Sequence, residues 1–348
     1  MKNPKCSNKI YINEQKEKLS YDKKWLSYEE QYELLKSRGM SFENYPKEKA
    51  LNKLEFIGYY RLSGYSYAFR KAKTDDNFIQ GTSFREIIEL YKFDRKLKLL
   101  LLDAIERIEI ALRGCIAYCL TKKSVSYLDD DSQFDRNRII TIPSNRKKSI
   151  NEENITVGGL VEKLRKSIKK KINQKAPAEP SIEHLISKYK EPYPLWIVIH
   201  VLDLSDLCDL YQIIDKETAK KISIKFGVES AKVFTSWIQT IRSVRNICAH
   251  HSRLVDKNLK RLPSIPKSKD SFPWTDLWSE ENIDSTKIFP LICIIHHMLN
   301  AIKASNSWDE RMSALIKQFP NIGIDKMNSA EKVLNCPKGW EEYLKKQD

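Results

Sequence analysis

Residues 83–121 read SFREIIELYKFDRKLKLLLLDAIERIEIALRGCIAYCLT, and this stretch decides the fold class. Apolar residues recur in it every three or four positions, which is the period of one face of an α-helix. Its polar side places Asp103 four residues before Arg107 and Glu109 four residues before Arg113, which predicts ordinary surface ion pairs. A helix this long with one apolar stripe is typical of a helical bundle. The stripe consists of Phe93, Leu97, Leu101, Ala104, Ile108, Leu112, Ile116 and Cys119.

The rest of the chain favours an all-α fold around this helix. Glycine is scarce, with 10 in 348 residues, and further segments share the helical period. Ser27 suits the N-cap of a helix that ends near Gly39, and Pro46 suits the first position of a helix that ends near Ile57. Later helices are predicted at about 195, 216–226, 229–252 and 284–303, and irregular structure at 122–150. The predicted regions are a basic flexible arm at 1–24, an N-terminal helical region at 25–82, a helical bundle at 83–305 with an insertion at about 122–190, and a C-terminal helical tail at 306–348.

Composition excludes several classes of protein. With 41% hydrophobic residues and 13 prolines, the chain is neither disordered throughout nor collagen-like. No apolar run approaches the roughly 18 residues that a membrane helix needs, and no apolar signal segment is visible after Met1. The seven cysteines include no C-x-x-C pair, so we expect reduced and mostly buried thiols in a cytoplasmic protein.

The net charge points to a polyanionic partner. The 61 Lys and Arg residues exceed the 46 Asp and Glu residues by 15, and such an excess most often indicates nucleic acid binding. Residues 163–175 carry seven Lys or Arg and no acid. Two interpretations stay open for this run: a contact with an RNA backbone through Lys169, Lys170 and Lys171, or a solvated insertion.

The segment GYYRLSGY at residues 58–65 combines aromatic rings with a guanidinium between two glycines. The glycines predict a break in the helix. Tyr59 and Tyr60 could stack on bases while Arg61 and Arg70 bind phosphate, as in surfaces that bind single-stranded nucleic acid. Alternatively, the segment is a packed turn whose tyrosine rings are buried.

The segment WIQTIRSVRNICAHHSR at residues 237–253 carries the strongest chemical signal. In a helix, Trp237, Ile241, Val244 and Cys248 share an apolar face. On the opposite face the arginines would lie close together, and their like charges repel one another in water. A phosphate bound between them would remove this repulsion. Alternatively, His250 and Arg242 are structural and stabilise a helix C-terminus. The opposite face carries Gln239, Arg242, Asn246, His250 and Arg253.

These residue types suit metal-independent RNA cleavage without a cofactor. Histidine can remove the proton of a 2′-hydroxyl near neutral pH, and arginine can hold the phosphodiester and stabilise the charge that develops. Arg245 and His250 lie five residues apart, which is about 140° around an ideal helix. Either Arg245 reaches around the helix, the helix is distorted, or two copies of the segment complete one site across a dimer.

Arg245-Asn246-Ile247-Cys248-Ala249-His250 resembles the R-x(4–6)-H signature of HEPN ribonuclease domains. Four segments, in the same order along the chain, resemble the Abi-like family of phage abortive-infection proteins, the AbiD/AbiF group. The resemblance covers roughly residues 25–256. The four segments are IGYYRLSGY at 57–65, LYKFDRKL at 90–97, AIERIEIALR at 104–113 and RNICAHHSRL at 245–254.

The resemblance implies an all-α HEPN bundle in a bacterial host, with toxin-like RNA cleavage that halts phage propagation. Arg245 and His250 would be catalytic, with Asn246 as the polar neighbour. Glu106 or Glu109 would add an acidic group from another helix. Because such domains usually pair and this chain has one signature, the resemblance also implies a homodimer. His251 falls nearer the apolar face and is expected to be structural.

Three functions follow from these expectations. The first is an endoribonuclease of an abortive-infection or toxin–antitoxin system, with RNA as substrate and a small regulatory RNA as a further partner. The second is a non-catalytic RNA-binding protein of the same fold, which would form a ribonucleoprotein with a small RNA. The third is a protein-interaction scaffold whose charge is incidental. None of them requires a metal, a cofactor or a membrane.

Overall fold

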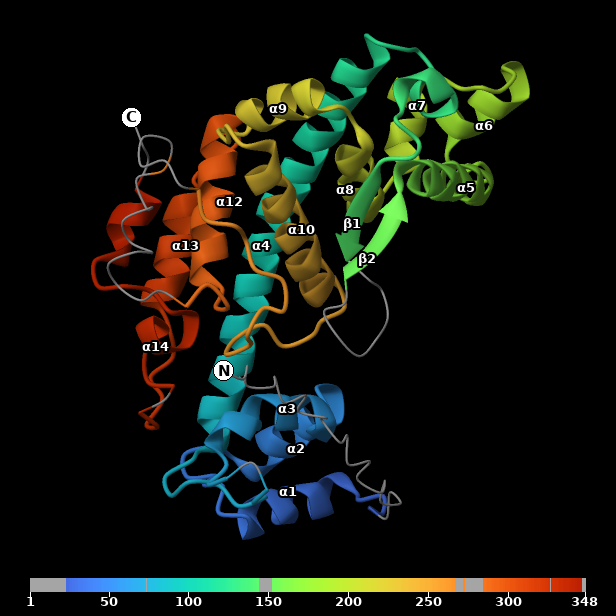
Figure 1. Cartoon of the computed structure of the whole chain (residues 1–348). Coiled ribbons are helices and arrows are strands. Elements are labelled where there is room, and N and C mark those ends of the chain that lie inside the picture. The colour runs from blue at the N-terminus through green and yellow to red at the C-terminus, as the bar shows by residue number, and fades with distance from the viewer. Residues whose placement is uncertain are drawn as a thin grey trace, which may run out of the picture.

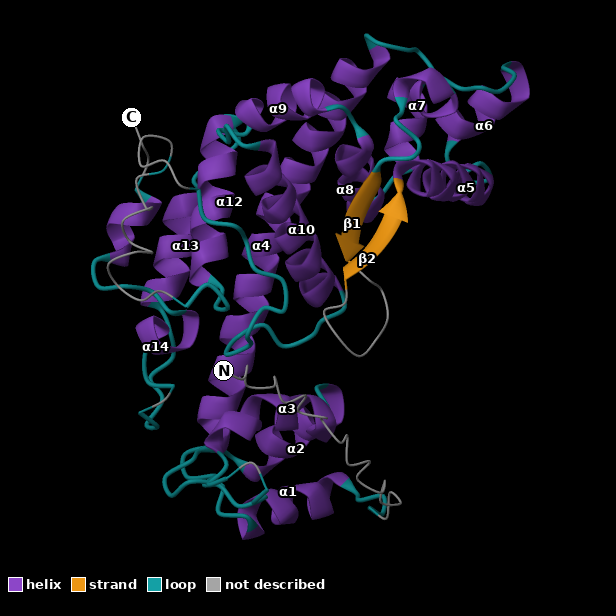
Figure 2. Ribbon diagram, in the orientation of Figure 1, coloured by secondary structure: helices purple, strands orange, loops and turns teal. Residues whose placement is uncertain are grey.

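The computed structural model describes residues 23–72, 74–143, 152–266, 272, 284–325 and 327–345. Helix α4 (Phe84–Thr121) runs through the middle of the molecule, and the other helices are arranged around it (Figure 1). Only two short strands interrupt the helical architecture in the described ranges (Figure 2). The predicted all-α fold class is therefore confirmed.

Helix α4 begins at the N-cap Ser83, whose side chain and that of Glu86 form a capping box. Seven of the eight residues of its predicted apolar stripe are buried, and Cys119 is half-buried. Fully burying one such aliphatic side chain stabilises a fold by about 1.5–3 kcal/mol, so this stripe organises the core. Helices α8, α10, α12 and α13 all pack against α4.

The N-terminal helices form a separate layer at the start of α4, shown in blue in Figure 1. The predicted N-cap at Ser27 is confirmed, and its side chain and that of Glu30 form a capping box. Pro46 is an N-cap residue rather than the first helical residue. The predicted break at 58–65 is half wrong, because Gly58 (φ +92°) ends one helix but Gly64 lies inside the next. Packing against α4 overrides the low helix propensity of glycine there. The helices are α1 (Tyr28–Ser37), α2 (Lys47–Phe56) and α3 (Tyr59–Ser66).

The insertion contains regular structure that the sequence analysis missed. Part of the stretch predicted to be irregular is an antiparallel hairpin of β1 (Ile139–Pro143) and β2 (Glu152–Thr156), with Ile139 opposite Thr156. β-branched residues favour these strands, but the strands are short and lie among many charged residues, so their alternation of apolar and polar side chains was not recognised. Residues 144–151 lie outside the described ranges. The hairpin leads into α5 (Val157–Lys175), α6 (Pro180–Lys188), the predicted short α7 (Leu195–Val198) and the unpredicted α8 (Leu204–Ile213).

The C-terminal half confirms the predicted helices to within a few residues. The tail predicted as a short helical segment packs on the bundle through α13 and the turn at Trp340–Leu344. Residues 1–22 of the predicted arm, which include Cys6, lie outside the described ranges. No helix among the described residues is long and apolar enough to cross a membrane. The helices are α9 (Lys216–Lys225), α10 (Ala231–Ala249), α12 (Phe289–Ala301), α13 (Trp308–Lys317) and α14 (Ala330–Leu334).

Short 3₁₀ turns join several of these elements. They are Tyr67–Phe69, Tyr127–Asp129, Asp131–Gln133, Ile199–Val201 and Trp340–Leu344. All six cysteines in the described ranges are free thiols, four of them buried and two half-buried. The expectation of reduced and mostly buried thiols is met for these six.

Candidate active site

Helix α10 turns its apolar face into the bundle, as its sequence predicts. Ser230 caps the helix by accepting a hydrogen bond from the Val233 amide. Burial raises the pKa of the Cys248 thiol to about 12, so this group stays protonated in the core. The opposite face is thereby fixed toward α8 and solvent. The four residues of the predicted apolar face, Trp237, Ile241, Val244 and Cys248, are all buried, and so is Gln239 of the opposite face.

The charged face of α10 begins with Arg242, which is already paired inside the protein. Its guanidinium lies 3.4 Å from an Asp209 oxygen on α8 and 3.3 Å from the side-chain oxygen of Gln239. Lys163 of α5 contacts the other Asp209 oxygen at 2.7 Å. Arg242 therefore links α10 to α8, which is a structural role other than the predicted one at a helix C-terminus. Its RNA contact stays a prediction.

Arg245, Asn246 and His250 lie at the end of α10. Arg245 is half-buried, and its Nη1 is 3.5 Å from Oδ1 of Asn246. His250 is the exposed C-cap residue of the helix. No hydrogen bond or ion pair joins Arg245 to His250 within the described ranges. The helix is regular up to its cap, so within one chain it does not turn the arginine toward the histidine.

The chain leaves α10 through a sharp turn at His251. The His251 amide donates to the carbonyl of Cys248 at 3.0 Å, and the Ser252 amide donates to that of Ile247 at 2.9 Å. This pair of bonds is the Schellman motif, which usually has glycine where His251 stands. His251 adopts φ +55°, and its ring is exposed rather than set near the apolar face as expected. Its backbone carbonyl accepts a hydrogen bond from Arg61 of α3 at 2.6 Å.

A buried carboxylate holds the chain just beyond this turn. Asp94 of α4 is fully buried, and its Oδ1 accepts hydrogen bonds from the amides of Leu254 (3.0 Å) and Val255 (2.7 Å). Its Oδ2 accepts a hydrogen bond from the Tyr65 hydroxyl at 2.6 Å and forms an ion pair with Lys98 at 2.8 Å. Burial and the Asp94 charge raise the pKa of Tyr65 above its ordinary value, so the hydroxyl remains a donor.

This carboxylate brings together three of the four segments on which the resemblance rests, namely 57–65, 90–97 and 245–254. A family model described as Abi-like protein matches residues 52–256, which contain all four segments.

The chain belongs to the Abi-like protein family.

Membership of the Abi-like family connects the chain with abortive infection, a defence against phage. The fourth segment, 104–113, lies on α4 further along the same helix. No curated protein and no solved structure matches the chain. The assignment of roles to individual residues therefore rests on the geometry of this Abi-like chain.

The two acidic candidates on α4 lie in different surroundings. Glu109 is half-buried and forms an ion pair with Arg113 at 2.7 Å, while Arg113 also donates to the carbonyl of Leu202. Burial raises the pKa of the Cys208 thiol on α8, with the Arg242 charge opposing the rise and the Glu109 charge adding to it. Glu106 is exposed. Glu109 is the one of the two that faces the α8–α10 side, and the role of either as a catalytic group stays a prediction.

Cations gather along the chain that follows the turn. The nearest acid to Arg253 is Asp256, at 3.9 Å, and Lys287 also contacts that carboxylate at 3.3 Å. Burial, followed by repulsion from Lys260 and Arg253, lowers the pKa of Lys257. The protein therefore tolerates uncompensated positive charge beside the end of α10. The sequence analysis named Arg253 but missed Lys257 and Lys260.

Three of the four residues predicted to bind RNA in the N-terminal layer, Tyr59, Tyr60 and Arg70, border one open groove. The groove has a volume of about 590 Å³ and lies between α1 and α3. Tyr60 is 91% exposed at its edge, whereas the Tyr59 hydroxyl accepts a hydrogen bond from Arg38 at 2.9 Å. Arg70 is paired with Asp76 at 2.8 Å. Stacking on Tyr60 is sterically open, and Arg70 is partly neutralised.

The lysines predicted to bind RNA on α5 are mostly paired with acids of the same protein. Lys171 contacts both Asp203 (2.7 Å) and Asp206 at the start of α8. Lys169 contacts Glu191 at 3.1 Å. Lys170 is exposed. The basic run is thus a helix docked on α8, and its RNA contacts stay a prediction.

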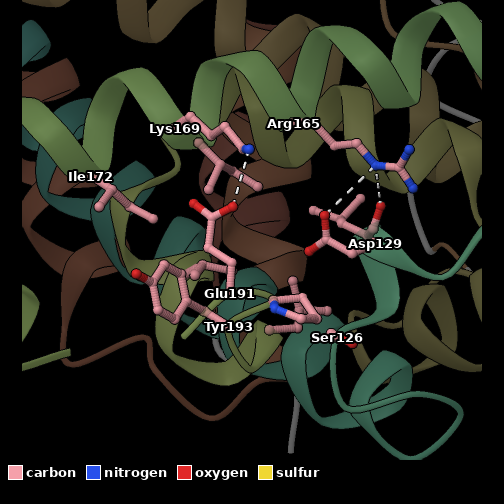
Figure 3. Close-up of a pocket in the computed structure, with 12 residues that line it drawn as sticks. Ser126, Asp129, Arg165, Lys169, Ile172, Glu191 and Tyr193 are labelled. Carbon is pink, nitrogen blue, oxygen red and sulfur yellow. Dashed lines mark hydrogen bonds and ion pairs between the residues drawn. The ribbon is translucent and has the colours of Figure 1, made fainter. Parts of the chain in front are cut away.

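A small pocket lies between α5 and the segment that leads into α7 (Figure 3). Arg165 and Asp129 approach at one side of it, and Lys169 and Glu191 at the other. Its volume of about 30 Å³ has room for about two water molecules, so it carries no substrate chemistry. Among the described residues, no group of three His, Cys, Asp or Glu side chains could hold a metal ion.

The sequence analysis missed the buried network of Asp94, Tyr65 and Lys98. One signal was present, because Asp94 stands in helical register with Leu90 and Leu97 on the apolar stripe of α4. A carboxylate at such a position is costly unless it is paired and hydrogen-bonded, so it indicates partners from elsewhere in the chain. Those partners lie 29 and 160 residues away, which no local pattern reveals.

Proposed function

We propose that this Abi-like protein is a metal-independent endoribonuclease that acts in abortive infection. The observation that carries the proposal is the place of the R-x(4)-H segment in the fold. The segment ends in an exposed histidine, beside cations that lack full compensation and at a turn fixed by three of the family segments. This combination supports proton transfer next to a bound phosphodiester.

In the proposed reaction, His250 removes the proton of a 2′-hydroxyl of the RNA. The 2′-oxygen then attacks the adjacent phosphorus, and the bond from phosphorus to the 5′-oxygen of the next nucleotide breaks. The leaving oxygen takes up a proton, so the products are a 2′,3′-cyclic phosphate and a 5′-hydroxyl. Arg245 stabilises the charge of the pentavalent phosphorus. DNA lacks the 2′-hydroxyl and is not cleaved by this route.

The separation of Arg245 from His250 favours a site shared by two copies of the chain. Both residues belong to the α10 end, yet they do not contact one another within the chain. In a symmetric dimer, the same surface patch of two protomers is self-complementary. Each composite site would then combine the His250 of one protomer with the Arg245 of the other.

The RNA would reach this site over the positive surface at the end of α10. Among the described residues, no carboxylate forms an ion pair with Lys257 or Lys260, and Arg253 reaches Asp256 only at 3.9 Å. Tyr60 offers a ring for base stacking. The predicted contacts at Lys169, Lys170 and Lys171 would be secondary, because two of these side chains already have acidic partners.

The test compares RNA integrity in cells that express wild-type protein, His250→Ala or Arg245→Ala under conditions that activate the protein. His200→Ala is the matched control, since His200 is also exposed but lies on another element, the 3₁₀ turn Ile199–Val201 that precedes α8. We expect RNA degradation with wild type and His200→Ala, and intact RNA with the two site variants. Equal RNA integrity in all four samples would refute the proposed ribonuclease activity.

A second candidate function is RNA binding without cleavage. It is favoured by the cations at Arg253, Lys257 and Lys260, which need no histidine to bind phosphate. Purified protein would then carry a small RNA. The bound RNA would raise the ratio of the ultraviolet absorbance of nucleobases to that of aromatic side chains. Binding would survive His250→Ala, be weakened by salt, and show no cleavage products.

A further inference from the structure

Helix α3 supports the turn after His250 through two side chains of the same face, one by a direct contact and one through Asp94. Arg61 and Tyr65 are four residues apart, which places them one above the other on α3. Arg61 donates to the carbonyl of His251 directly. Tyr65 acts through Asp94, which holds the amides of Leu254 and Val255. The segment 251–255 is therefore held at both of its ends.

The turn needs such support because its residue type is unfavourable. His251 has the left-handed conformation (φ +55°), which glycine adopts without strain and residues with a Cβ adopt at a cost. The adjacent carbonyl of Ser252 also accepts a hydrogen bond, from Lys98 at 3.2 Å. External hydrogen bonds on consecutive carbonyls compensate for a conformation that the local sequence does not favour.

We infer that Arg61, Tyr65 and Asp94 are positioning residues that fix the backbone on the C-terminal side of His250. The inference rests on the proposed function for its catalytic consequence, but its structural part stands on the contacts alone. None of the three side chains is assigned a contact with the reacting atoms. Arg61, whose phosphate contact stays a prediction, donates to the protein backbone in this structure.

The inference makes the N-terminal layer part of the active site. Because α3 belongs to residues 25–82, a displacement of this layer from the bundle would release the turn and with it the imidazole of His250. A shift of about 1 Å in a reacting group can lower a rate by about a hundredfold, so release of the turn would silence the enzyme.

The first experiment measures kcat and KM for RNA cleavage by Arg61→Ala and Tyr65→Phe. Tyr211→Phe is the matched control, because Tyr211 is also buried and also donates one hydrogen bond, of 2.7 Å, far from the site. We expect kcat to fall about tenfold or more in both site variants with KM nearly unchanged, and no such change in the control.

A rescue variant separates positioning from phosphate binding. Glycine at position 251 removes the backbone strain, so His251→Gly should restore most of kcat in the Arg61→Ala background. If Arg61 instead binds phosphate, Arg61→Ala will raise KM, and His251→Gly will restore nothing. That outcome would overturn the inference for Arg61.

A readout without RNA keeps the inference distinct from the proposed function. Amide hydrogen exchange at residues 251–255 should become faster in Arg61→Ala and in Tyr65→Phe, and stay unchanged in Tyr211→Phe. Unchanged exchange in both site variants would overturn the inference even if the protein cleaves RNA. If exchange changes as expected while wild type and His250→Ala leave RNA equally intact, the proposed function fails and the positioning network stands.

Discussion

Helix α5 and the end of α10 are both rich in positive charge, but the protein treats the two regions differently. On α5, Lys163, Lys169 and Lys171 each contact a carboxylate of a neighbouring element within about 3 Å, as is usual for charge-assisted contacts. At the end of α10, Arg253 lies 3.9 Å from its nearest acid, and Lys257 is repelled by its neighbours.

The difference shows that a count of cations does not locate a binding surface. The acids that pair with the three lysines come from α8 and from Glu191, which are distant in sequence, so most of the run at 163–175 has no visible acidic partner in the local sequence. Beside the end of α10, the buried Asp94 of α4 already has four partners, which are Lys98, the Tyr65 hydroxyl and two backbone amides. Positive charge remains available for a ligand there.

The largest expected effect comes from breaking the buried ion pair beside the end of α10. Asp94→Asn leaves Lys98 buried with an uncompensated charge, since the Lys98 side chain is only 9% exposed. Removing one partner of a buried pair costs about 3–5 kcal/mol, so the free energy of unfolding should fall by that amount. Urea unfolding followed by circular dichroism measures it.

The matched control is Glu191→Gln, which removes an exposed pair with Lys169 on α5. Such pairs contribute about 0–1 kcal/mol, so this variant should unfold close to wild type. A similar loss of stability in both variants would contradict the distinction between the two regions.

The sequence predicted the helix α10 better than its contacts, and it did not predict α5 as a helix. Periodicity identified α4 and α10 because each helix buries one continuous apolar stripe. The hairpin of β1 and β2 and the helix α8 were not predicted. The strands are too short to show a clear period, and α8 is buried on nearly every face and so has no single apolar stripe. The R-x(4)-H segment was recognisable locally. The pairing of Asp94 with Leu254, and of Lys171 with Asp203, depends on tertiary folding and has no local signature.

An intermediate effect is expected on the salt dependence of RNA binding. Arg253→Gln with Lys257→Gln removes two available cations, whereas Lys169→Gln with Lys171→Gln removes two that are already paired. Each lost contact with single-stranded RNA should lower the slope of log K against log salt by about 0.7, so the first double variant should lose about 1.4.

Filter binding or fluorescence anisotropy with a short unstructured RNA, at several salt concentrations, gives these slopes. The α5 double variant should change the slope by less than about half as much, since its cations release fewer counterions on binding. Equal losses of slope in the two double variants would show that the ion pairs on α5 open when RNA binds.

The smallest effect concerns the pH dependence of stability on the α5 side. Although desolvation opposes it, hydrogen bonds from Lys171 and the Asp206 amide lower the pKa of Asp203. A carboxyl group with a lowered pKa stabilises the fold above its unfolded pKa of about 3.9, and this contribution is lost as pH falls through the folded value. Desolvation lowers the pKa of Lys171, but its hydrogen bonds to Asp203 and Asp206 outweigh this and raise the pKa. The contribution of Lys171 to stability is therefore lost as pH rises through its pKa in the folded protein.

Lys171→Met should therefore flatten the stability curve at both ends. Below about pH 4 the variant should lose less stability than wild type, because Asp203 returns toward its ordinary pKa and takes up its proton with less penalty. Between about pH 5 and 8 the difference should stay within about 1 kcal/mol, because Asp203 is 52% exposed and water screens the pair. Thermal unfolding at about pH 3, 7 and 11.5 measures this, because these values lie about one unit below the ordinary pKa of Asp, between the two ordinary pKa values, and about one unit above that of Lys. A variant curve parallel to that of wild type would mean that Lys171 contributes no net electrostatic stability, and that its charge remains as available to RNA as the cations at the end of α10.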